Sequence, residues 1–168
     1  MSAAVRAALT LLFFAVSNAS ANIPITPWQP VALQAQADSC GASAVARLLS
    51  LTKGVEVDES QVSALVESGN AQHGRGASLA QLRRALAQLG YDSSTHRVDE
   101  STLRTRPLPL LLRLTEPTQH YVVLQGLAAD WSQIFDPARG FLWVDTQALL
   151  TRWRNSQGLG VILELAKP

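Results

Sequence analysis

The order of the periodic segments is the feature that most restricts the fold of this chain. Apolar residues recur at helical spacing chiefly in the first half, most regularly at Leu79, Leu82, Leu86 and Leu89. The second half contains short β-prone runs separated by turns, at residues 108–114, 121–124, 131–135, 141–144 and 159–165. Helices followed by strands, without βαβ alternation, indicate an α+β domain in which N-terminal helices pack on a C-terminal antiparallel sheet.

Start and stop signals delimit the helices. We expect helices at residues 40–51, 59–66 and 78–89, and a short one at 145–153 between the last two strands. Asp38 or Ser39 is the expected N-cap of the first helix, and Gly54 ends it. Ser78 and Gln81 stand at capping-box spacing at the start of the third.

Prolines and glycines mark the segments between these elements. Pro107 and Pro109 stand at the start of the first strand-like run, and proline has no N–H for a sheet ladder, so this strand is expected to begin at a sheet edge. Residues 22–33 contain three prolines and read as an extended lead-in. The glycine-rich residues 69–76 read as a loop, either a solvated connector or a mobile flap beside a cleft.

The first 21 residues have the pattern of a secretory signal peptide. Arg6 is basic, residues 7–16 are apolar, and residues 19–21 read Ala-Ser-Ala, so cleavage is expected after Ala21. The apolar run is shorter than the about 20 residues that span a bilayer, which leaves an uncleaved anchor as the alternative. We therefore expect a signal peptide at 1–21, a single domain at 22–168, and a periplasmic or secreted protein with no membrane span after cleavage.

The balance of charge argues against two classes of partner. Arg6 is the one charged residue among the first 21, so the rest of the chain carries 13 of the 14 basic residues and all 13 acidic residues. A near-neutral domain lacks the basic surface that binds nucleic acid or anionic membranes, and neither is expected as a partner. The arginines expected to form one solvated face are Arg83, Arg84, Arg104 and Arg106.

For the other histidines and the tryptophans, the sequence predicts no catalytic or metal-binding role. His73 and His96 stand at no recognisable metal-ligand spacing, and no phosphate-binding pattern occurs, so neither a metal nor a cofactor is predicted. The tryptophans are expected in the core or at its rim, with a role in gripping peptide as the alternative for one of them. They are Trp28, Trp131, Trp143 and Trp153.

Cys40 is the only cysteine, and it stands where the first helix is expected to begin. An exported protein with one cysteine has no intramolecular disulfide partner for it. Unpaired N–H groups and the positive end of the dipole at a helix N-terminus favour the thiolate. Cys40 is therefore either a small buried hydrophobe or a nucleophile.

A thiol nucleophile needs a base, and the base needs an orienting group. His120 opens one expected strand and Asp136 closes the next, so antiparallel pairing would bring their side chains together. Packing of the first helix on the sheet would place Cys40 against His120. This arrangement predicts Cys40 as nucleophile, His120 as general base and then acid, and Asp136 as orienting group. Either Gln34 or Gln36 would donate to the developing oxyanion beside the Cys40 backbone N–H.

Four segments together resemble one known family. They are Gln34 with Asp-Ser-Cys-Gly-Ala-Ser-Ala-Val-Ala-Arg-Leu-Leu at 38–49, Gly-Ala-Ser-Leu-Ala-Gln-Leu-Arg-Arg at 76–84, Gln-His-Tyr-Val-Val-Leu-Gln-Gly at 119–126, and Asp-Pro-Ala-Arg-Gly at 136–140. In this order they resemble the bacteriocin-processing cysteine peptidases. The resemblance implies a papain-like fold, cleavage of leader peptides after a double glycine, and catalysis by Cys40, His120 and Asp136. It also implies Gln34 as the oxyanion donor, since the family's glutamine lies six residues before its cysteine.

The chain departs from the familiar members of that family, which are domains of peptide-exporting transporters and face the cytoplasm. It carries a signal peptide, and Ser39 precedes the cysteine, as in stand-alone exported relatives that accompany fibre or amyloid-type export systems. We expect an exported cysteine endopeptidase that cleaves a small secreted protein or its leader, with a double-glycine leader or a fibre-forming subunit as substrate. ATP would be involved only through a separate transporter. The alternatives are a non-catalytic peptide-binding or chaperone module of the same fold, and acyl transfer to an amine instead of water.

Overall fold

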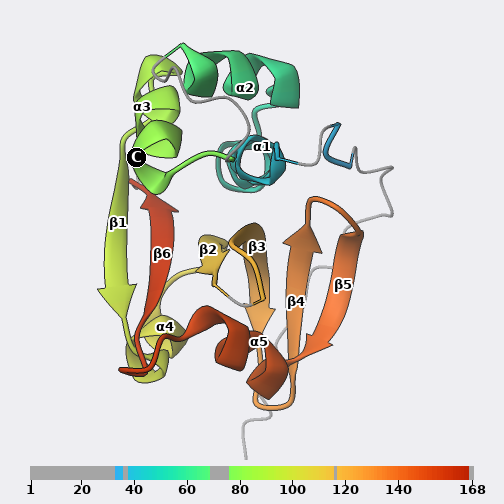
Figure 1. Cartoon of the computed structure of the whole chain (residues 1–168), viewed down its shortest axis with the longest axis vertical. Helices are drawn as coiled ribbons and strands as arrows, with labels where there is room; N and C mark the ends of the chain where they lie inside the picture. Colours follow the sequence, from blue (N-terminus) through green and yellow to red (C-terminus); the bar gives the residue numbers. More distant parts are fainter. Residues whose placement is uncertain (1–32, 36–37, 69–75, 116, 167–168) are drawn as a thin grey trace, which may run out of the picture. The chain divides into compact units, whose positions relative to one another are not determined.

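Six antiparallel strands form one sheet with helices on both of its faces (Figure 1). The computed structural model describes residues 33–35, 38–68, 76–115 and 117–166. All of them belong to one compact unit, residues 31–168. The expected signal peptide, Trp28, Gln36 and His73 therefore lie outside the described residues.

The elements follow one another in the expected order, with two additions. The helices are α1 (Cys40–Lys53), α2 (Glu59–Glu67), α3 (Leu79–Gln88), α4 (Glu100–Thr105) and α5 (Thr146–Trp153). The strands are β1 (Ser93–Val98), β2 (Leu110–Leu114), β3 (His120–Leu127), β4 (Trp131–Asp136), β5 (Gly140–Asp145) and β6 (Gly160–Leu165). Their order in the sheet is β1-β6-β2-β3-β4-β5.

Alternation along the strands divides the apolar side chains between two cores. Leu111, Val123 and Phe135 face α1, α2 and α3 in one cluster, and their neighbours Leu112 and Val122 face α4 and α5 in the other. Figure 1 shows α1, α2 and α3 gathered together, away from α4 and α5. Because successive strand residues point to opposite faces, the near-continuous apolar runs of β2 and β3 are buried on both sides.

The local signals at the helix ends are confirmed. Gly54 has φ 64° and its N–H donates to the Ser50 carbonyl, so it ends α1 in the left-handed conformation that glycine favours. Ser78 and Gln81 form the capping box of α3, in which Ser78 Oγ accepts from Gln81 N and Gln81 Oε1 accepts from Ser78 N. Ser39 is the N-cap of α1 but its side chain makes no capping hydrogen bond.

Two elements, β1 and α4, are absent from the sequence-based expectation. β1 is an edge strand of mostly polar residues, so it has no apolar alternation by which it could be recognised. α4 has six residues, too few for a periodic pattern, although Asp99 Oδ1 caps it by accepting from Thr102 N at 2.8 Å. Strand pairing with β6 forms β1 and the Asp99 cap starts α4, although neither sequence is clearly periodic.

Two expectations about positions in the fold are wrong. β2 lies inside the sheet between β6 and β3, because both prolines precede its first paired residue, Leu110. The four arginines do not share a face, because Arg83 and Arg84 belong to α3 whereas Arg104 and Arg106 lie at α4, on the other side of the sheet.

The tryptophan expectation holds in one place and fails in two. Trp153 is buried at 1% exposure, but Trp131 and Trp143 are 57% and 61% exposed. These two residues stand on the β4–β5 hairpin at one edge of the sheet, and their side chains extend into solvent there. They are too exposed to belong to the core or its rim.

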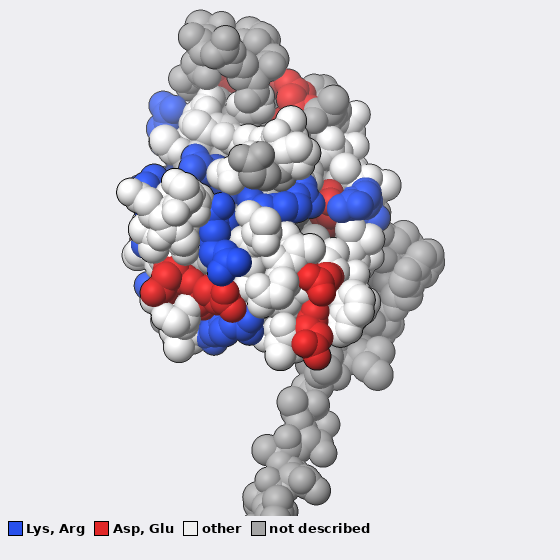
Figure 2. Space-filling view, turned by 60° about the horizontal axis from the view of Figure 1, so that its bottom comes forward, with Lys and Arg blue, Asp and Glu red and all other residues white. Residues whose placement is uncertain are grey.

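Charged side chains of both signs meet on the surface. On the face drawn in Figure 2, acidic side chains lie among the basic ones. Arg104 and Arg154 both bind Glu100, at 2.8 and 3.0 Å, and Arg106 binds Glu164 at 3.1 Å. In the part of the chain that the structure describes, no helix is long and apolar enough to cross a bilayer.

Close packing of α5 on β6 gives a prediction about stability. A Cβ atom at Gly160 would overlap the Trp153 indole, whose Nε1 donates to the Val161 carbonyl at 3.1 Å. Gly160→Ala should lower the free energy of unfolding by about 1–3 kcal/mol, measured in urea. Gly126→Ala is the matched control, because its Cβ would meet Gln133 Cβ at 3.3 Å and needs only a small adjustment. Equal effects of the two substitutions would contradict this account.

Candidate active site

Cys40 is the first residue of α1 and is 9% exposed. Burial raises the pKa of its thiol, but hydrogen bonds with the His120 side chain and with the backbone of Tyr121 and Gly41 lower it. The positive charge of His120 lowers it further, and the net result is a pKa below the ordinary value. The environment therefore favours the thiolate over the inert thiol of a core cysteine.

His120 and Asp136 form an ion pair beside Cys40. His120 Nε2 lies 2.9 Å from Asp136 Oδ1, and the two side chains are 19% and 5% exposed. The hydrogen bond with Asp136, followed by that with Cys40, raises the pKa of His120 to about 9 despite its burial. Because Nε2 is engaged by the carboxylate, Nδ1 is the ring nitrogen available to the thiol. At neutral pH His120 is therefore an imidazolium and Asp136 a carboxylate, and the charge of His120 favours the thiolate form of Cys40.

The register of β3 and β4 brings the histidine and the aspartate together. Val123 pairs with Phe135, which makes His120 and Asp136 diagonal neighbours on the same side of the two strands. Diagonal neighbours of this kind are within reach of long or aromatic side chains. The sequence-based expectation that adjacent strands bring these two residues together is confirmed.

The turn after β4 holds the Asp136 carboxylate. Oδ1 also accepts from Ala138 N at 3.0 Å, and Oδ2 accepts from Arg139 Nε at 3.1 Å. Burial raises the pKa of Asp136, but the hydrogen bonds from His120, Ala138 and Arg139 and the charge of His120 bring it down to about 2. Gly140 then has φ 83°, which a glycine adopts without strain. Asp136 is therefore a turn former and a partner of His120 at once.

Gln34 is tied to the same turn. Its backbone N–H donates to the Pro137 carbonyl at 2.8 Å, and the next N–H, of Ala35, donates to Glu59 Oε1 at 2.9 Å. These two bonds fix the segment between the turn after β4 and the start of α2. Gln34 thus lies in the neighbourhood of Asp136, and its role as an oxyanion donor stays a prediction.

Two residues of the site were not singled out from the sequence. Tyr121 bonds to the Cys40 thiol through its backbone, and burial raises the pKa of its phenol to about 12, so it stays neutral. A Cβ at Gly41 would stand 3.2 Å from Ala77 Cβ, Leu82 Cδ2 and Tyr121 Cδ2. Glycine at this position therefore lets the first turn of α1 approach β3 and α3 closely. The sequence shows that a glycine follows Cys40, but it does not show which side chains pack against that glycine.

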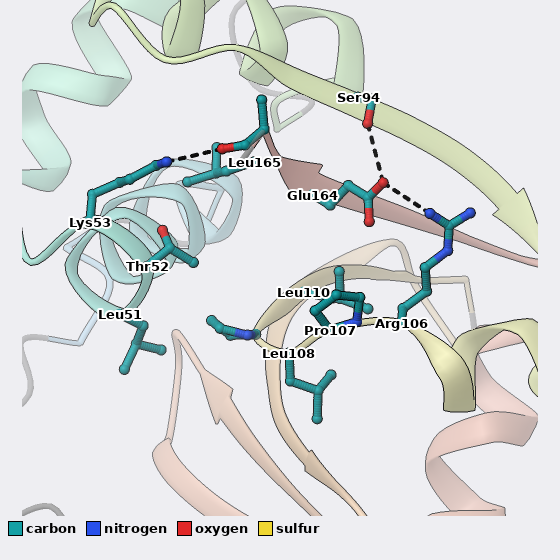
Figure 3. Close-up of a pocket in the computed structure, with 12 residues that line it drawn as sticks. Leu51, Thr52, Lys53, Ser94, Arg106, Pro107, Leu108, Leu110, Glu164 and Leu165 are labelled. Atoms are coloured by element: carbon teal, nitrogen blue, oxygen red, sulfur yellow. Dashed lines mark hydrogen bonds and ion pairs between the residues drawn. The ribbon is translucent and has the colours of Figure 1, made fainter. Parts of the chain in front are cut away.

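A separate cavity of about 560 Å³ lies at the other end of α1 (Figure 3). It is lined by Leu51 and Lys53 of α1, by Leu108, and by Arg106 and Glu164, which pair with each other. The last turn of α1 is roughly 20 Å along the helix from Cys40 at 1.5 Å per residue. None of Cys40, His120, Asp136 and Gln34 lines this cavity, so it is not the site of the chemistry.

The described residues contain no group of three or more His, Cys, Asp and Glu side chains placed to hold a metal ion. His96, one of the histidines considered from the sequence, pairs instead with Glu164 at 3.1 Å. Ser94 Oγ also lies 2.9 Å from His96 Nε2. These contacts make His96 part of a polar cluster on β1 and β6.

Comparison with known proteins gives one family and one curated relative. The Peptidase C39 family matches residues 28–166. The probable functional amyloid protease FapD of Pseudomonas fluorescens is 29% identical over 121 residues, which are 70% of this chain and 54% of that protein. The chain therefore spans about half the length of the curated relative it matches.

Solved structures share the fold. A double glycine motif protease from an AMS/PCAT transporter, in complex with its leader peptide, has a TM-score of 0.65 at 22% identity, covering 81% of this chain and 89% of that one. The peptidase domain of Streptococcus ComA, a bi-functional ABC transporter, has a TM-score of 0.66 at 18% identity, covering 81% and 96%. These likenesses confirm the expected α+β, papain-like fold.

The ion pair predicts how the reactivity of the thiol depends on Asp136. In Asp136→Asn the largest cause of the raised His120 pKa is gone, so the imidazolium is less stable and the Cys40 pKa rises toward its ordinary value. The rate of alkylation of Cys40 by iodoacetamide at pH 7 should fall about tenfold or more, as a shift of one pKa unit implies. In the native protein, the rate of alkylation should decline only when the pH falls below the lowered pKa of Cys40.

Asp145→Asn is the control for that substitution. Asp145 lies at the far end of β5 and caps α5 by accepting from Ala148 N at 2.7 Å. Its loss should leave the alkylation rate at the native value. Native reactivity in Asp136→Asn would show that the carboxylate does not support the charge of His120.

Proposed function

The chain belongs to the peptidase C39 family and is a cysteine peptidase, and from this premise we propose that Cys40, His120 and Asp136 are its catalytic residues. The observation that carries the proposal is the contact of all three groups, with the thiol pKa lowered and the imidazole pKa raised. Gln34 is proposed as a donor to the oxyanion, together with the Cys40 backbone N–H. Its support is the backbone bond that ties it to Pro137, directly after Asp136.

The charge state of the site sets the order of proton transfers. His120 takes the thiol proton in the resting enzyme, and the Cys40 thiolate attacks the carbonyl carbon of the scissile bond. The imidazolium then gives its proton to the leaving amine, which departs and leaves a thioester on Cys40. Neutral His120 next takes a proton from water as the water attacks the thioester. The carboxylic acid product leaves, and the thiolate–imidazolium pair is restored.

Asp136 keeps its charge throughout the cycle. Its pKa of about 2 means that it does not take the proton from His120 at neutral pH. The bonds from Ala138 and Arg139 hold the carboxylate in place, so that it fixes the ring orientation of His120 and stabilises the imidazolium. Asp136 is therefore proposed as the orienting group of the triad.

We propose a peptide or a small exported protein as the substrate, cut after a pair of small residues. A double glycine motif protease in complex with a leader peptide has the same fold, and the probable functional amyloid protease FapD matches 70% of this chain. We therefore propose two classes of substrate, a double-glycine leader peptide and a fibre-forming subunit. Neither a nucleotide nor a metal has a role in the proposed reaction.

The proposed location is the periplasm or the exterior of the cell. Its support is the signal-peptide pattern of residues 1–21, which precedes the proposed catalytic domain at 22–168. The family match begins at residue 28, after the proposed cleavage site. An enzyme released by that cleavage would meet exported substrates after their translocation.

Removal of the thiol tests the chemistry. Cys40→Ala and Cys40→Ser should each lower the rate of cleavage of a peptide containing Gly-Gly by about a thousandfold or more, since no nucleophile of comparable strength remains. The products are measured by mass spectrometry, and the unfolding midpoints should stay near the native value. Cleavage that survives in Cys40→Ala would refute the proposed mechanism.

The same experiment separates two other activities. A second peptide with a free N-terminal amine, added with the native enzyme, reports transfer of the acyl group to an amine, because the product then gains the mass of that peptide instead of water. A native protein that binds the peptide and never cleaves it would be a peptide-binding module. The intact triad contacts argue against that reading.

A further inference from the structure

Large apolar side chains are exposed along the β4–β5 hairpin, whose turn holds the Asp136 carboxylate. Among the described residues five large hydrophobic side chains are exposed, and four of these lie in one region. Trp131, Phe141 and Trp143, here called the aromatic strip, belong to the β4–β5 hairpin and are 57%, 37% and 61% exposed. Leu33 is the fourth, and its Cδ2 lies 3.6 Å from the Cβ position of Gly140, where β5 begins.

Strand pairing puts the aromatic strip on one face of the sheet. Phe141 pairs with Phe135, Trp143 with Gln133, and Trp131 with Asp145, so the strip shares the face of Phe135 that packs against α1. Arg47 of α1 reaches this far, with its guanidinium 4.7 Å from the Phe141 ring centre. Beyond Phe141 the indoles of Trp143 and Trp131 are open to solvent.

β5 is the outermost strand on this side of the sheet (Figure 1). Exposed edges usually carry lysine, proline or a bulge, which prevent pairing with another chain. Residues 140–145 contain no lysine or proline, and the irregular register lies between β3 and β4 instead. The opposite edge, β1, is polar and carries His96 and Arg97. Of the two edges, only β5 therefore presents an apolar strand without these protections.

We propose that an extended segment of the peptide substrate docks on β5 as a seventh strand of the sheet. This inference rests on the proposed function and identifies how the substrate is held. Side chains of the added strand would alternate between the two faces. On one face they would meet Phe141 and Trp143, and on the other Leu142 and Val144, which are partly buried against the second core. A substrate segment with apolar side chains on both faces of the added strand therefore fits this edge.

The edge leads to the proposed catalytic residues. Gly140 pairs with Asp136, so the first residue of β5 stands across from the residue that orients His120. The six residues of β5 span roughly 20 Å, so a segment docked along β5 would end beside the turn that holds Asp136. Arg47 and Arg139 stand at this end of the strand, and Arg139 is 58% exposed. They favour an acidic side chain in the part of the substrate nearest the scissile bond.

Amide hydrogen exchange tests the docking. The Cys40→Ala variant of the full chain is mixed with synthetic peptides of about ten residues, in which alternating Val and Thr residues precede or follow a Gly-Gly pair that has one Asp beside it. One of the two peptides should slow the exchange of amides within residues 141–145 about tenfold, compared with the protein alone. The reason is that the N–H groups of β5 that point away from β4 then bond to the peptide instead of to water. Unchanged exchange with both peptides overturns the proposal. Full protection of β5 before any peptide is added also overturns it, because the edge is then already covered.

A pair of variants tests the contribution of the aromatic strip. Trp143→Ser removes the most exposed indole, and Leu108→Ser removes the exposed leucine at the cavity of Figure 3 as a matched control. The readout is kcat/KM for the long peptide divided by kcat/KM for a short peptide that spans only the Gly-Gly pair. This ratio should fall about fivefold in Trp143→Ser and keep its native value in Leu108→Ser. An unchanged ratio in Trp143→Ser, or equal losses in both variants, contradicts the docking edge.

The two proposals fail separately. Cleavage of the short peptide by the native enzyme depends on the triad and not on β5. If it is cleaved while the exchange at β5 is unchanged, the docking edge is refuted and the proposed function stands. If neither peptide is cleaved, the proposed cleavage fails, and the exchange measurement still decides whether β5 takes a seventh strand.

Discussion

The ion pair between His120 and Asp136 is the interaction on which the proposed chemistry depends. It raises the pKa of the imidazole to about 9, and the resulting positive charge helps to lower the pKa of the Cys40 thiol against the effect of burial. The pair exists because β3 and β4 meet in one register, with Val123 opposite Phe135. A slip by one residue would turn the two side chains to opposite faces, so the core packing of both strands also protects the site.

The same packing places the nucleophile. α1 lies on β3 through Val45, Leu48 and Leu49, all fully buried, and its first turn meets the start of that strand. Gly41 has no side chain to hold the turn away from Tyr121, whose backbone bonds to the thiol. The N-terminus of α1, the start of β3 and the turn after β4 thus bring Cys40, His120 and Asp136 together. The opposite end of α1 forms the separate cavity, where the charged groups are paired with each other.

Sequence reasoning succeeded where the signal was local or strongly periodic. The capping box of Ser78 and Gln81, the stop at Gly54 and the pairing of His120 with Asp136 were all predictable. It failed for β1, whose polar residues give no alternation, and for β2, whose prolines precede the sheet instead of marking its edge. It also failed for Trp131 and Trp143, because exposure depends on which neighbouring elements cover a strand.

By itself the sequence determined the class of fold, the helix caps and the set of residues able to do thiol chemistry, because caps, periodicity and residue type act over a few neighbouring positions. The tertiary structure decided which of these residues meet, how their pKa values shift and which edge of the sheet is left open. Those properties depend on distances of a few ångströms between residues far apart in the chain, such as 2.9 Å between His120 and Asp136. Only the packing of α1 on the sheet and the register of β3 and β4 set such distances, and a linear pattern does not contain them.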